Sequence, residues 1–408
     1  MFGARPGATL AAAGPGVVGV VGAGQLARML LESASALGLR AVVMAEDAGE
    51  AAALVAGDLF FGSPLVEPDL RELASRCDVV TFDHELVDLE LLSQLEDEGV
   101  TVRPSVATLQ LAVDKRVMRA GLHAAGVPVP RFATLPGHTE ADARPAIEAF
   151  AAEHGWPLVL KAGRGGYDGH GVWPVEDERE AAAVVHSAEE RGIHLLVEEY
   201  VPIEAELAVL VARRPGGEVV SWPAVETAQV GGVCREVLVP GRLGPDLLEA
   251  AGALARRVAD VVGSVGVLAV ELFSCRGRLL VNEVAARPHN TGHWTIEGAV
   301  TSQFENHLRA VLDLPLGDTT PGAPNVASVN VFGDERGEDP ATRLAEAFAV
   351  DGAHVHLYGK APRPGRKLGH VTVCGDDPAD VRSRAWRAAR ALGTPVPAGI
   401  DLPVGVSR

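Results

Sequence analysis

The chain has 408 residues, of which 47% are hydrophobic, so it can bury two or three domain cores and is not a disordered chain. Its 36 Lys and Arg residues against 54 Asp and Glu residues give a formal net charge of −18, and a field of that sign repels nucleic acid and anionic membranes. We therefore expect neither as a partner, and every long apolar run is interrupted before it could span a bilayer.

Residues 1–15 are rich in alanine and glycine and are expected to be a disordered extension rather than a secretory signal. The four cysteines are scattered and form no CxxC pair, which favours reduced thiols in the cytoplasm over a disulfide framework or a zinc site.

Short apolar runs alternate with helical stretches through residues 16–126. This pattern predicts a parallel sheet covered on both faces, so we expect a Rossmann-like N-terminal domain of the α/β class. Two prolines in GVPVPRF mark a boundary near residue 127, after which several strands are separated by turns rather than helices. Residues 127–320 are predicted to form an α+β region with antiparallel pairing, and residues 321–408 a C-terminal domain with its own strands and a last helix.

Gly22, Gly24 and Ala27 match a GxGxxG/A pattern directly after the first apolar strand, and Glu46 closes the next strand. Such glycines let a backbone approach a phosphate at a helix N-terminus, and alone they would favour a nicotinamide-dependent oxidoreductase. The alternative is that they only permit the tight strand–helix turn of any doubly wound domain.

Two glutamates are predicted to face each other across a hairpin. If residues 268–273 and 278–284 pair around Gly277, Glu271 lies opposite Glu283, with Cβ atoms roughly 4.5–5.5 Å apart. Carboxylates that close repel unless one is protonated or a cation lies between them. Mg²⁺ prefers a few carboxylates together with phosphate oxygens and water, and Asn282 could add an oxygen. Apolar neighbours disfavour the alternative, an exposed hairpin whose acids are solvated.

A glycine-rich segment, GRGGYDGHG at residues 163–171, follows Lys161 at the end of an apolar strand. The segment is not a Walker-type loop, but the backbone N–H groups of a glycine loop can still cradle phosphates, and a lysine beside it can pair with them. Further on, VEEYV is followed by Glu206, and the linker between them could offer backbone groups to an adenine edge.

The series Lys115, Lys161, GRGGYDGHG, VEEYV, Glu206, ELF and NE resembles the ATP-grasp ligases. More narrowly, GAGQLARM, TFDHE, NEVAARPHNTGHWT and YGK…RKLGH look like the 5-(carboxyamino)imidazole ribonucleotide synthases of purine biosynthesis, over residues 16 to 390. The resemblance implies an ATP-grasp fold with a Rossmann-like N-terminal domain and a C-terminal completing domain. It also implies carboxylation of 5-aminoimidazole ribonucleotide with ATP and bicarbonate, through carboxyphosphate, by a cytoplasmic homodimer.

By this resemblance, the nucleotide would be held by Lys115, Lys161, Gly166, Gly169, Gly171, Glu198, Val201, Glu206, Asn282 and Glu283. Glu271 and Glu283 would hold Mg²⁺, with Mn²⁺ as an alternative. The expected catalytic residues, facing the ribonucleotide or bicarbonate, are Tyr167, Asp168, Arg287, His289 and Lys360. Further substrate contacts are expected from Gln25, Glu85, Asn290, Arg366 and Lys367, the last two at the 5′-phosphate because basic side chains suit a dianion.

Three departures from the family's pattern are His170 in place of Lys or Arg, Ala286 in place of proline, and Gly231 in place of Asp. The competing functions are another ATP-grasp ligase, such as a formate-dependent glycinamide ribonucleotide transformylase or a biotin carboxylase-like enzyme, the oxidoreductase, and a non-catalytic nucleotide sensor.

Overall fold

The computed structural model describes residues 16–137, 139–166 and 169–401. Tyr167, Asp168 and the expected extension 1–15 lie outside the described residues. None of the described helices is both long and apolar enough to cross a membrane.

The N-terminal unit is built on a parallel sheet in the order β3-β2-β1-β4. Its strands are β1 (Val17–Val21), β2 (Arg40–Ala45), β3 (Leu59–Phe61) and β4 (Val79–Phe82), and its helices are α1 (Gln25–Ala36), α2 (Glu67–Arg76) and α3 (Leu89–Asp97). Because β1 is apolar at every position, it packs on both faces. Val18 and Val20 pack with α1, whereas Val21 belongs to the core beneath α2 and α3. The predicted parallel sheet with helices on both faces is confirmed.

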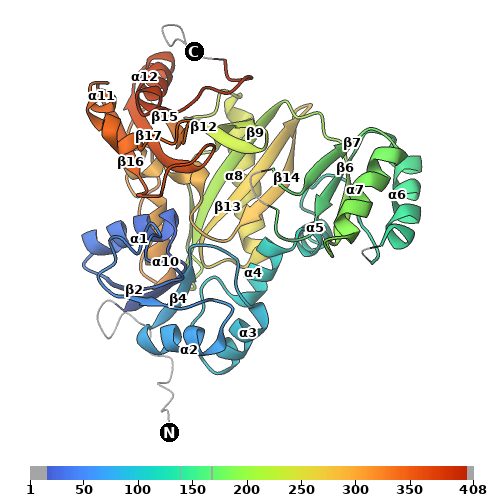
Figure 1. Ribbon diagram of the computed structural model, residues 1–408, viewed down its shortest axis with the longest axis horizontal. Coiled ribbons are helices and arrows are strands. Elements are labelled where there is room, and N and C mark those ends of the chain that lie inside the picture. The colour runs from blue at the N-terminus through green and yellow to red at the C-terminus, as the bar shows by residue number, and fades with distance from the viewer. Residues whose placement is uncertain (1–15, 138, 167–168, 402–408) are drawn as a thin grey trace.

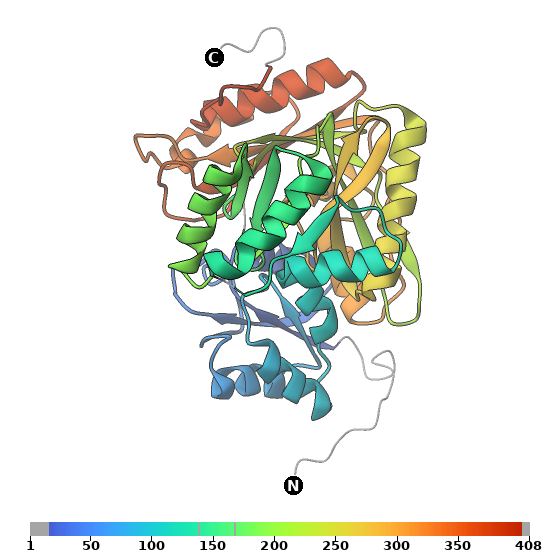
Figure 2. The ribbon, with the colours of Figure 1, turned by 90° about the vertical axis from the view of Figure 1, so that its right-hand side faces the viewer.

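A second, antiparallel sheet in the order β5-β8-β6-β7 forms the subdomain that carries the glycine-rich segment. It contains β5 (Phe132–Thr134), β6 (Leu158–Ala162), β7 (Val172–Val175) and β8 (Leu195–Glu199), with α6 (Glu140–His154) and α7 (Glu178–Glu189) packed on it. This subdomain projects to the right in Figure 1 and faces the viewer in Figure 2. Helices α4 (Val106–Val113) and α5 (Lys115–Ala124) connect it to the N-terminal unit.

The largest sheet lies in the middle of the molecule, in the order β14-β13-β9-β11-β12-β15-β17-β16, with β10 paired to β9. Its strands are β9 (Ala205–Arg213), β10 (Val219–Ser221), β11 (Val225–Val230), β12 (Val233–Val239), β13 (Gly266–Cys275), β14 (Arg278–Ala285), β15 (Asn325–Phe332), β16 (Ala353–Leu357) and β17 (Lys367–Gly375). Its described pairings are antiparallel, as predicted. Because β15 pairs with β12, the C-terminal strands extend the same sheet that holds Glu271 and Glu283.

Helices cover this sheet along its length. Helix α8 (Pro245–Val262) packs on β9 and β13, and α12 (Pro378–Ala391) packs on β15 and β17. Helix α10 (Gln303–Val311) lies between β13 and α1, so it joins the N-terminal unit to the large sheet. The remaining short elements are η2 (Asn290–Gly292), α9 (Thr295–Gly298), η3 (Pro340–Arg343) and α11 (Leu344–Phe348).

Candidate active site

The two predicted acidic residues do face each other. Glu271 on β13 is the register partner of Glu283 on β14, so the predicted pairing is confirmed. The hairpin turn is made by Arg276 and Gly277, both with positive φ, and on its own this two-residue turn would place Glu271 opposite Asn282. A bulge between Glu271 and Leu272 shifts the register by one residue and brings Glu283 opposite Glu271.

Each of the two carboxylates has a basic side chain beside it. Lys115 Nζ lies 2.5 Å from Glu283 Oε1, and His289 Nε2 lies 3.8 Å from Glu271 Oε1. Within the described ranges, no group of three or more His, Cys, Asp or Glu side chains has the spacing of a complete metal site. The donor set of two carboxylates and the Asn282 amide oxygen nevertheless suits Mg²⁺, because this ion is commonly held by one or two carboxylates plus substrate phosphates and water.

Behind the carboxylates lies a buried charged cluster. Glu198 Oε1 accepts from Arg119 Nε at 2.6 Å, and Glu198 Oε2 lies 2.7 Å from Lys161 Nζ. Lys161 Nζ also donates to Asn282 Oδ1 at 3.1 Å, which links the cluster to β14. Burial alone would raise the pKa of Glu198, but Arg119 and then Lys161 hold it at about 2. Burial lowers the pKa of Lys161, and Glu198 opposes that shift.

Arg119 was not predicted from the sequence. Its side chain is fully buried, and Nη1 and Nη2 have no hydrogen-bond partner in the part of the chain that the structure describes. Two cations around one carboxylate leave a net positive charge inside the protein, which favours an anion nearby. The one available sequence signal is that Arg119 follows Lys115 by one helical turn on α5 and therefore shares its face.

The glycine-rich segment is anchored at its base and is closely packed. Lys115 N–H donates to Gly163 O at 2.8 Å, and Asp114 accepts from Arg164 at 2.9 Å. Gly169 has φ +78°, and a Cβ there would lie 2.8 Å from Gly231 O, so the segment reaches the β11–β12 turn. Gly166 also has no room for a side chain, because a Cβ would lie 2.8 Å from His170 O. These contacts explain why glycine is needed at both positions.

The linker between β8 and β9 joins the two antiparallel sheets at residues 200–204. The carboxylate of Glu198 already pairs with Arg119 and Lys161, so the main chain of the linker is the group best placed to contact an adenine. Val201 is buried against Cys275 and Leu280 at the end of the β13–β14 hairpin. Glu206, at the start of β9, is partly buried, and burial raises its pKa to about 7.

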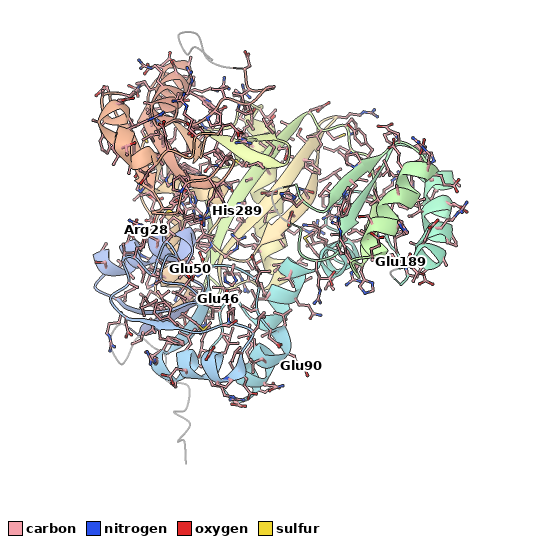
Figure 3. The ribbon with its side chains drawn as sticks, viewed as in Figure 1. Arg28, Glu46, Glu50, Glu90, Glu189 and His289 are labelled. Atoms are coloured by element: carbon pink, nitrogen blue, oxygen red, sulfur yellow. The ribbon has the colours of Figure 1, made fainter. Side chains whose placement is uncertain are left out.

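The segment after β14 carries the expected carboxylation residues. Arg287 Nε donates to Glu85 Oε2 at 2.8 Å, so β14 and the end of β4 meet there. His289 lies where the large sheet, α1 and the C-terminal strands converge (Figure 3). Burial, followed by the charges of Arg287 and Lys367, lowers the pKa of His289 to about 3, so this imidazole is neutral beside Glu271. Asn290 has its amide oxygen and nitrogen buried without a partner among the described residues.

The C-terminal strands bring a second basic group to the same region. Lys360, which follows β16, donates to Gln25 Oε1 at the start of α1. Burial and the nearby Arg366 lower the pKa of Lys360 to about 8. Arg366 donates to Ala361 O at 2.9 Å, and Lys367 begins β17. Gln25, Glu85, Arg287 and Lys360, far apart in sequence, are thus linked in pairs across the boundary between the N-terminal unit and the large sheet.

The N–H groups of the glycine turn at the start of α1 already bind a carboxylate of the protein itself. Asp83 accepts from Gly24 N–H at 2.6 Å and from Ala27 N–H at 2.8 Å, so its carboxylate sits at the helix N-terminus where a dinucleotide would place its pyrophosphate. A Cβ at Gly22 would lie 2.7 Å from the His84 ring. The turn is therefore structural, which removes the main observation behind the oxidoreductase alternative.

Comparison with known proteins agrees with this fold. Residues 16–113 match the ribonucleotide synthetase preATP-grasp domain, residues 120–304 the ATP-grasp domain, and residues 327–384 the phosphoribosylaminoimidazole carboxylase C-terminal domain. The N5-carboxyaminoimidazole ribonucleotide synthase of Mycobacterium tuberculosis is 48% identical over 383 residues, which are 92% of this chain and 87% of that protein. This chain belongs to the N5-carboxyaminoimidazole ribonucleotide synthase family.

Solved structures of the family have the same fold. The synthetase of Thermus thermophilus is 38% identical, with a TM-score of 0.81 over 92% of this chain and 98% of that one. The synthase of Aspergillus clavatus, solved with ADP and 5-aminoimidazole ribonucleotide, is 30% identical, with a TM-score of 0.84 over 93% of this chain and 99% of that one. The predicted ATP-grasp fold with a Rossmann-like start and a C-terminal completing part is thus confirmed, and members of this family are ATP-dependent carboxylating ligases.

Proposed function

We propose that this chain carboxylates 5-aminoimidazole ribonucleotide with bicarbonate and ATP, giving N5-carboxyaminoimidazole ribonucleotide, ADP and phosphate. One observation carries the proposal. Around the Glu271–Glu283 pair, Lys115 contacts Glu283, Lys161 contacts the neighbouring Asn282, and the neutral His289 lies beside Glu271, two residues after Arg287. This arrangement supports binding of a nucleoside triphosphate and a second substrate at the same edge of one sheet, as phosphoryl transfer between them requires.

The reaction is proposed to proceed in two steps. A bicarbonate oxygen attacks the γ-phosphorus, the bond from that phosphorus to the β–γ bridging oxygen breaks, and ADP and carboxyphosphate form. The exocyclic amine of the ribonucleotide then attacks the carboxyl carbon, phosphate leaves, and the amine loses one proton. Lys115 and Lys161 stabilise charge on the transferring phosphoryl group, and Arg287 and His289 orient the bicarbonate.

We propose that Glu271, Glu283 and Asn282 hold Mg²⁺, or Mn²⁺ in its place, together with the nucleotide phosphates. When bound, the ion would neutralise part of the negative charge of the phosphates. The main chain around Glu198 and Val201 is assigned to the adenine and Glu206 to the ribose. Gly166, Gly169 and Gly171 are assigned to a cover over the phosphates. The family resemblance adds Tyr167 and Asp168, which lie outside the described residues, as contacts to the ribonucleotide or bicarbonate.

The ribonucleotide is assigned to the second cluster. Lys360, Arg366 and Lys367 supply positive charge for its 5′-phosphate, and Gln25 and Glu85 approach from the N-terminal unit. Asn290 supports this placement, because a buried amide without partners in the described chain calls for a ligand or an ordered water.

Substitutions at Lys360 and Arg366 separate the two substrates. Lys360→Ala and Arg366→Ala are each expected to raise the KM for the ribonucleotide about 10- to 100-fold, the effect of losing a charge-assisted hydrogen bond, with little change in the Kd of ATP. Steady-state kinetics and a nucleotide-binding titration measure the two quantities. Arg363→Ala, an exposed arginine in the same loop, is the matched control. A larger loss of ATP affinity than of ribonucleotide affinity would reassign these residues.

ATP affinity is expected to depend on pH through Glu206. Its pKa is raised by burial to about 7, so the carboxylate loses its charge as the pH falls through that value and becomes a poorer acceptor for ribose hydroxyls. The Kd of ATP should therefore increase between pH 8 and pH 6, in addition to the change caused by ATP itself. Glu206→Gln removes the titrating carboxyl group. In this variant the Kd of ATP should change between pH 8 and pH 6 only as far as the titration of ATP itself requires. An identical pH dependence of the Kd in the wild type and in Glu206→Gln would show that Glu206 does not contact the ribose.

A homodimer in the cytoplasm is also proposed. Exposed apolar residues gather beside the edge strand β3, namely Phe61, Leu65 and Leu86, with Asp88 N–H near Pro64 O joining the two segments. Such a patch favours association, which sedimentation of the purified chain tests. The four cysteines are free, as expected in a reducing compartment.

ADP release with a panel of co-substrates tests the proposed function. The proposal requires release that depends on both bicarbonate and 5-aminoimidazole ribonucleotide. Release that depends instead on formate with glycinamide ribonucleotide, or on biotin, would favour another ATP-grasp ligase.

A further inference from the structure

Gln303, the first residue of α10, is fully buried and holds the main chain of His289 from both sides. Its Oε1 accepts from His289 N–H at 2.8 Å, and its Nε2 donates to His289 O at 2.8 Å. Its own N–H donates to Thr295 Oγ1 at 2.9 Å, which fixes the start of the helix against the segment after β14. His289 lies beyond the end of β14, and no strand in the described part of the chain pairs with it at this point. The Gln303 side chain therefore supplies the two backbone hydrogen bonds that a paired strand would make.

The approach of Gln303 to this segment is close and leaves little freedom. A Cβ at Gly292 would lie 2.6 Å from Gln303 Oε1 and 2.2 Å from Leu210 Cδ1, so only glycine permits the contact. The side chain of His289 is directed by the same short segment, since its Nδ1 lies 2.9 Å from Thr291 Oγ1. A shift of Gln303 would therefore move the His289 ring relative to Glu271.

The same amide also reaches toward the C-terminal strands. Gln303 Nε2 lies 3.3 Å from His293 Nδ1, and the His293 ring stacks on His370 of β17 with ring centroids 4.8 Å apart. Tyr358 Oη lies 2.9 Å from His370 Nδ1. Burial lowers the pKa values of His293 and His370 well below the usual range, so these contacts join neutral rings at neutral pH.

Tyr358 stands two residues before Lys360, and His370 stands three residues after Lys367. The chain of contacts from His289 through Gln303, His293 and His370 to Tyr358 therefore connects the segment assigned to bicarbonate with the strands assigned to the ribonucleotide. Gln303, His293, His370 and Tyr358 are buried, so the connection from His289 runs through the interior of the protein rather than over its surface.

We propose that Gln303 is a positioning residue for the carboxylation step, which holds His289 in register with the ribonucleotide-binding strands so that carboxyphosphate meets the amine before water does. The proposal rests on the proposed function and adds a residue that contacts no substrate. Small displacements of a positioned group cost up to about 10²-fold in rate. Loss of the Gln303 amide should therefore affect capture of the activated bicarbonate more than ATP cleavage.

The test is the ratio of carboxylated ribonucleotide to ADP, measured with saturating bicarbonate and ribonucleotide for the wild type, Gln303→Met and Gln303→Glu. Met keeps the length of the side chain and removes both hydrogen bonds, whereas Glu keeps the acceptor for His289 N–H and, at a pH where it is ionised, replaces the donor to His289 O by a negative charge. In both variants we expect the ratio to fall about 10- to 100-fold, with the Kd of ATP unchanged. Gln110→Met, an exposed glutamine on α4, is the matched control and should keep the wild-type ratio.

Both products come only from folded, active enzyme. Partial unfolding therefore lowers the rate of the reaction but leaves the ratio of carboxylated ribonucleotide to ADP unchanged. A wild-type ratio in either folded variant overturns the positioning role, even if the rate is reduced. Failure of the proposed function is distinguishable, because the wild type itself would then form no carboxylated ribonucleotide.

Discussion

Glu283→Gln is expected to reduce ATP turnover at least about 10²-fold while the protein stays folded. The substitution removes a negative charge from the pair that faces across β13 and β14, and metal-assisted stabilisation of a transferring phosphoryl group is worth several kcal/mol, with each 1.36 kcal/mol changing the rate tenfold. The side chain is 39% exposed, and glutamine has nearly the same volume and keeps an acceptor for Lys115, so the weakened ion pair should lower the free energy of unfolding by only about 1 kcal/mol. ADP release under saturating substrates and a urea denaturation curve measure the two quantities.

Glu226→Gln provides the matched control for this variant. Glu226 lies in the same sheet, on β11, and is paired with the exposed Arg242. Because Val225 is in register with Ala208, and Ala208 with Glu271, the side chain of Glu226 lies on the opposite face of the sheet from Glu271. It should keep nearly normal turnover. If Glu283→Gln were as active as Glu226→Gln at millimolar Mg²⁺, Glu283 would have no part in the metal site.

Arg119→Met is expected to lower the free energy of unfolding by about 3 kcal/mol. Glu198 would lose a charge-assisted hydrogen bond, typically worth about 1.5–3 kcal/mol, but Lys161 still compensates its charge, so the loss does not exceed the lower end of the roughly 3–5 kcal/mol that is typical of a buried charge left without a partner. Methionine fills much of the space that arginine leaves, so the loss reports mainly on charge. Urea denaturation in the absence of nucleotide measures it.

Arg144→Met tests whether the loss belongs to the buried setting. Arg144 also bridges two glutamates, Glu148 and Glu178, but at the surface of the second sheet, where such pairs contribute less than about 1 kcal/mol. Equal losses in the two variants would show that the Arg119–Glu198–Lys161 cluster contributes no more to stability than a surface ion pair.

Local patterns were sufficient to predict the main features of the fold and one part of the site. Alternating apolar runs and helices predicted the parallel sheet, and the turn-separated strands predicted antiparallel pairing. The Glu271–Glu283 pair was also predicted, although the turn and the bulge that produce it were not. The two-residue turn at Arg276 and Gly277 alone would pair Glu271 with Asn282, and the bulge shifts the pairing by one residue to Glu283. Strand periodicity determines neither the turn nor the bulge.

Residues that act through distant partners could not be predicted in this way. Arg119 and Gln303 lie on amphipathic helices, where a buried polar side chain has no sequence pattern distinct from an exposed one. Asp83 fills the glycine turn from the next parallel strand over, so GxGxxA alone could not distinguish a phosphate site from a capped helix. The pairing of β12 with β15 is likewise set by the packing of the whole sheet.

Activation of bicarbonate by ATP, before the carboxyl group reaches the ribonucleotide, can be followed with ¹⁸O-labelled bicarbonate. If carboxyphosphate forms, one labelled oxygen passes from bicarbonate to the phosphate that leaves, because the attacking oxygen stays on phosphorus when the carbon–oxygen bond breaks. Mass spectrometry of the phosphate formed with unlabelled ATP, water and ribonucleotide should therefore show one ¹⁸O atom per phosphate, in step with the carboxylated product. Carboxylated product accompanied by unlabelled phosphate would contradict this activation, since the phosphoryl group would then have been transferred to water or to the ribonucleotide instead.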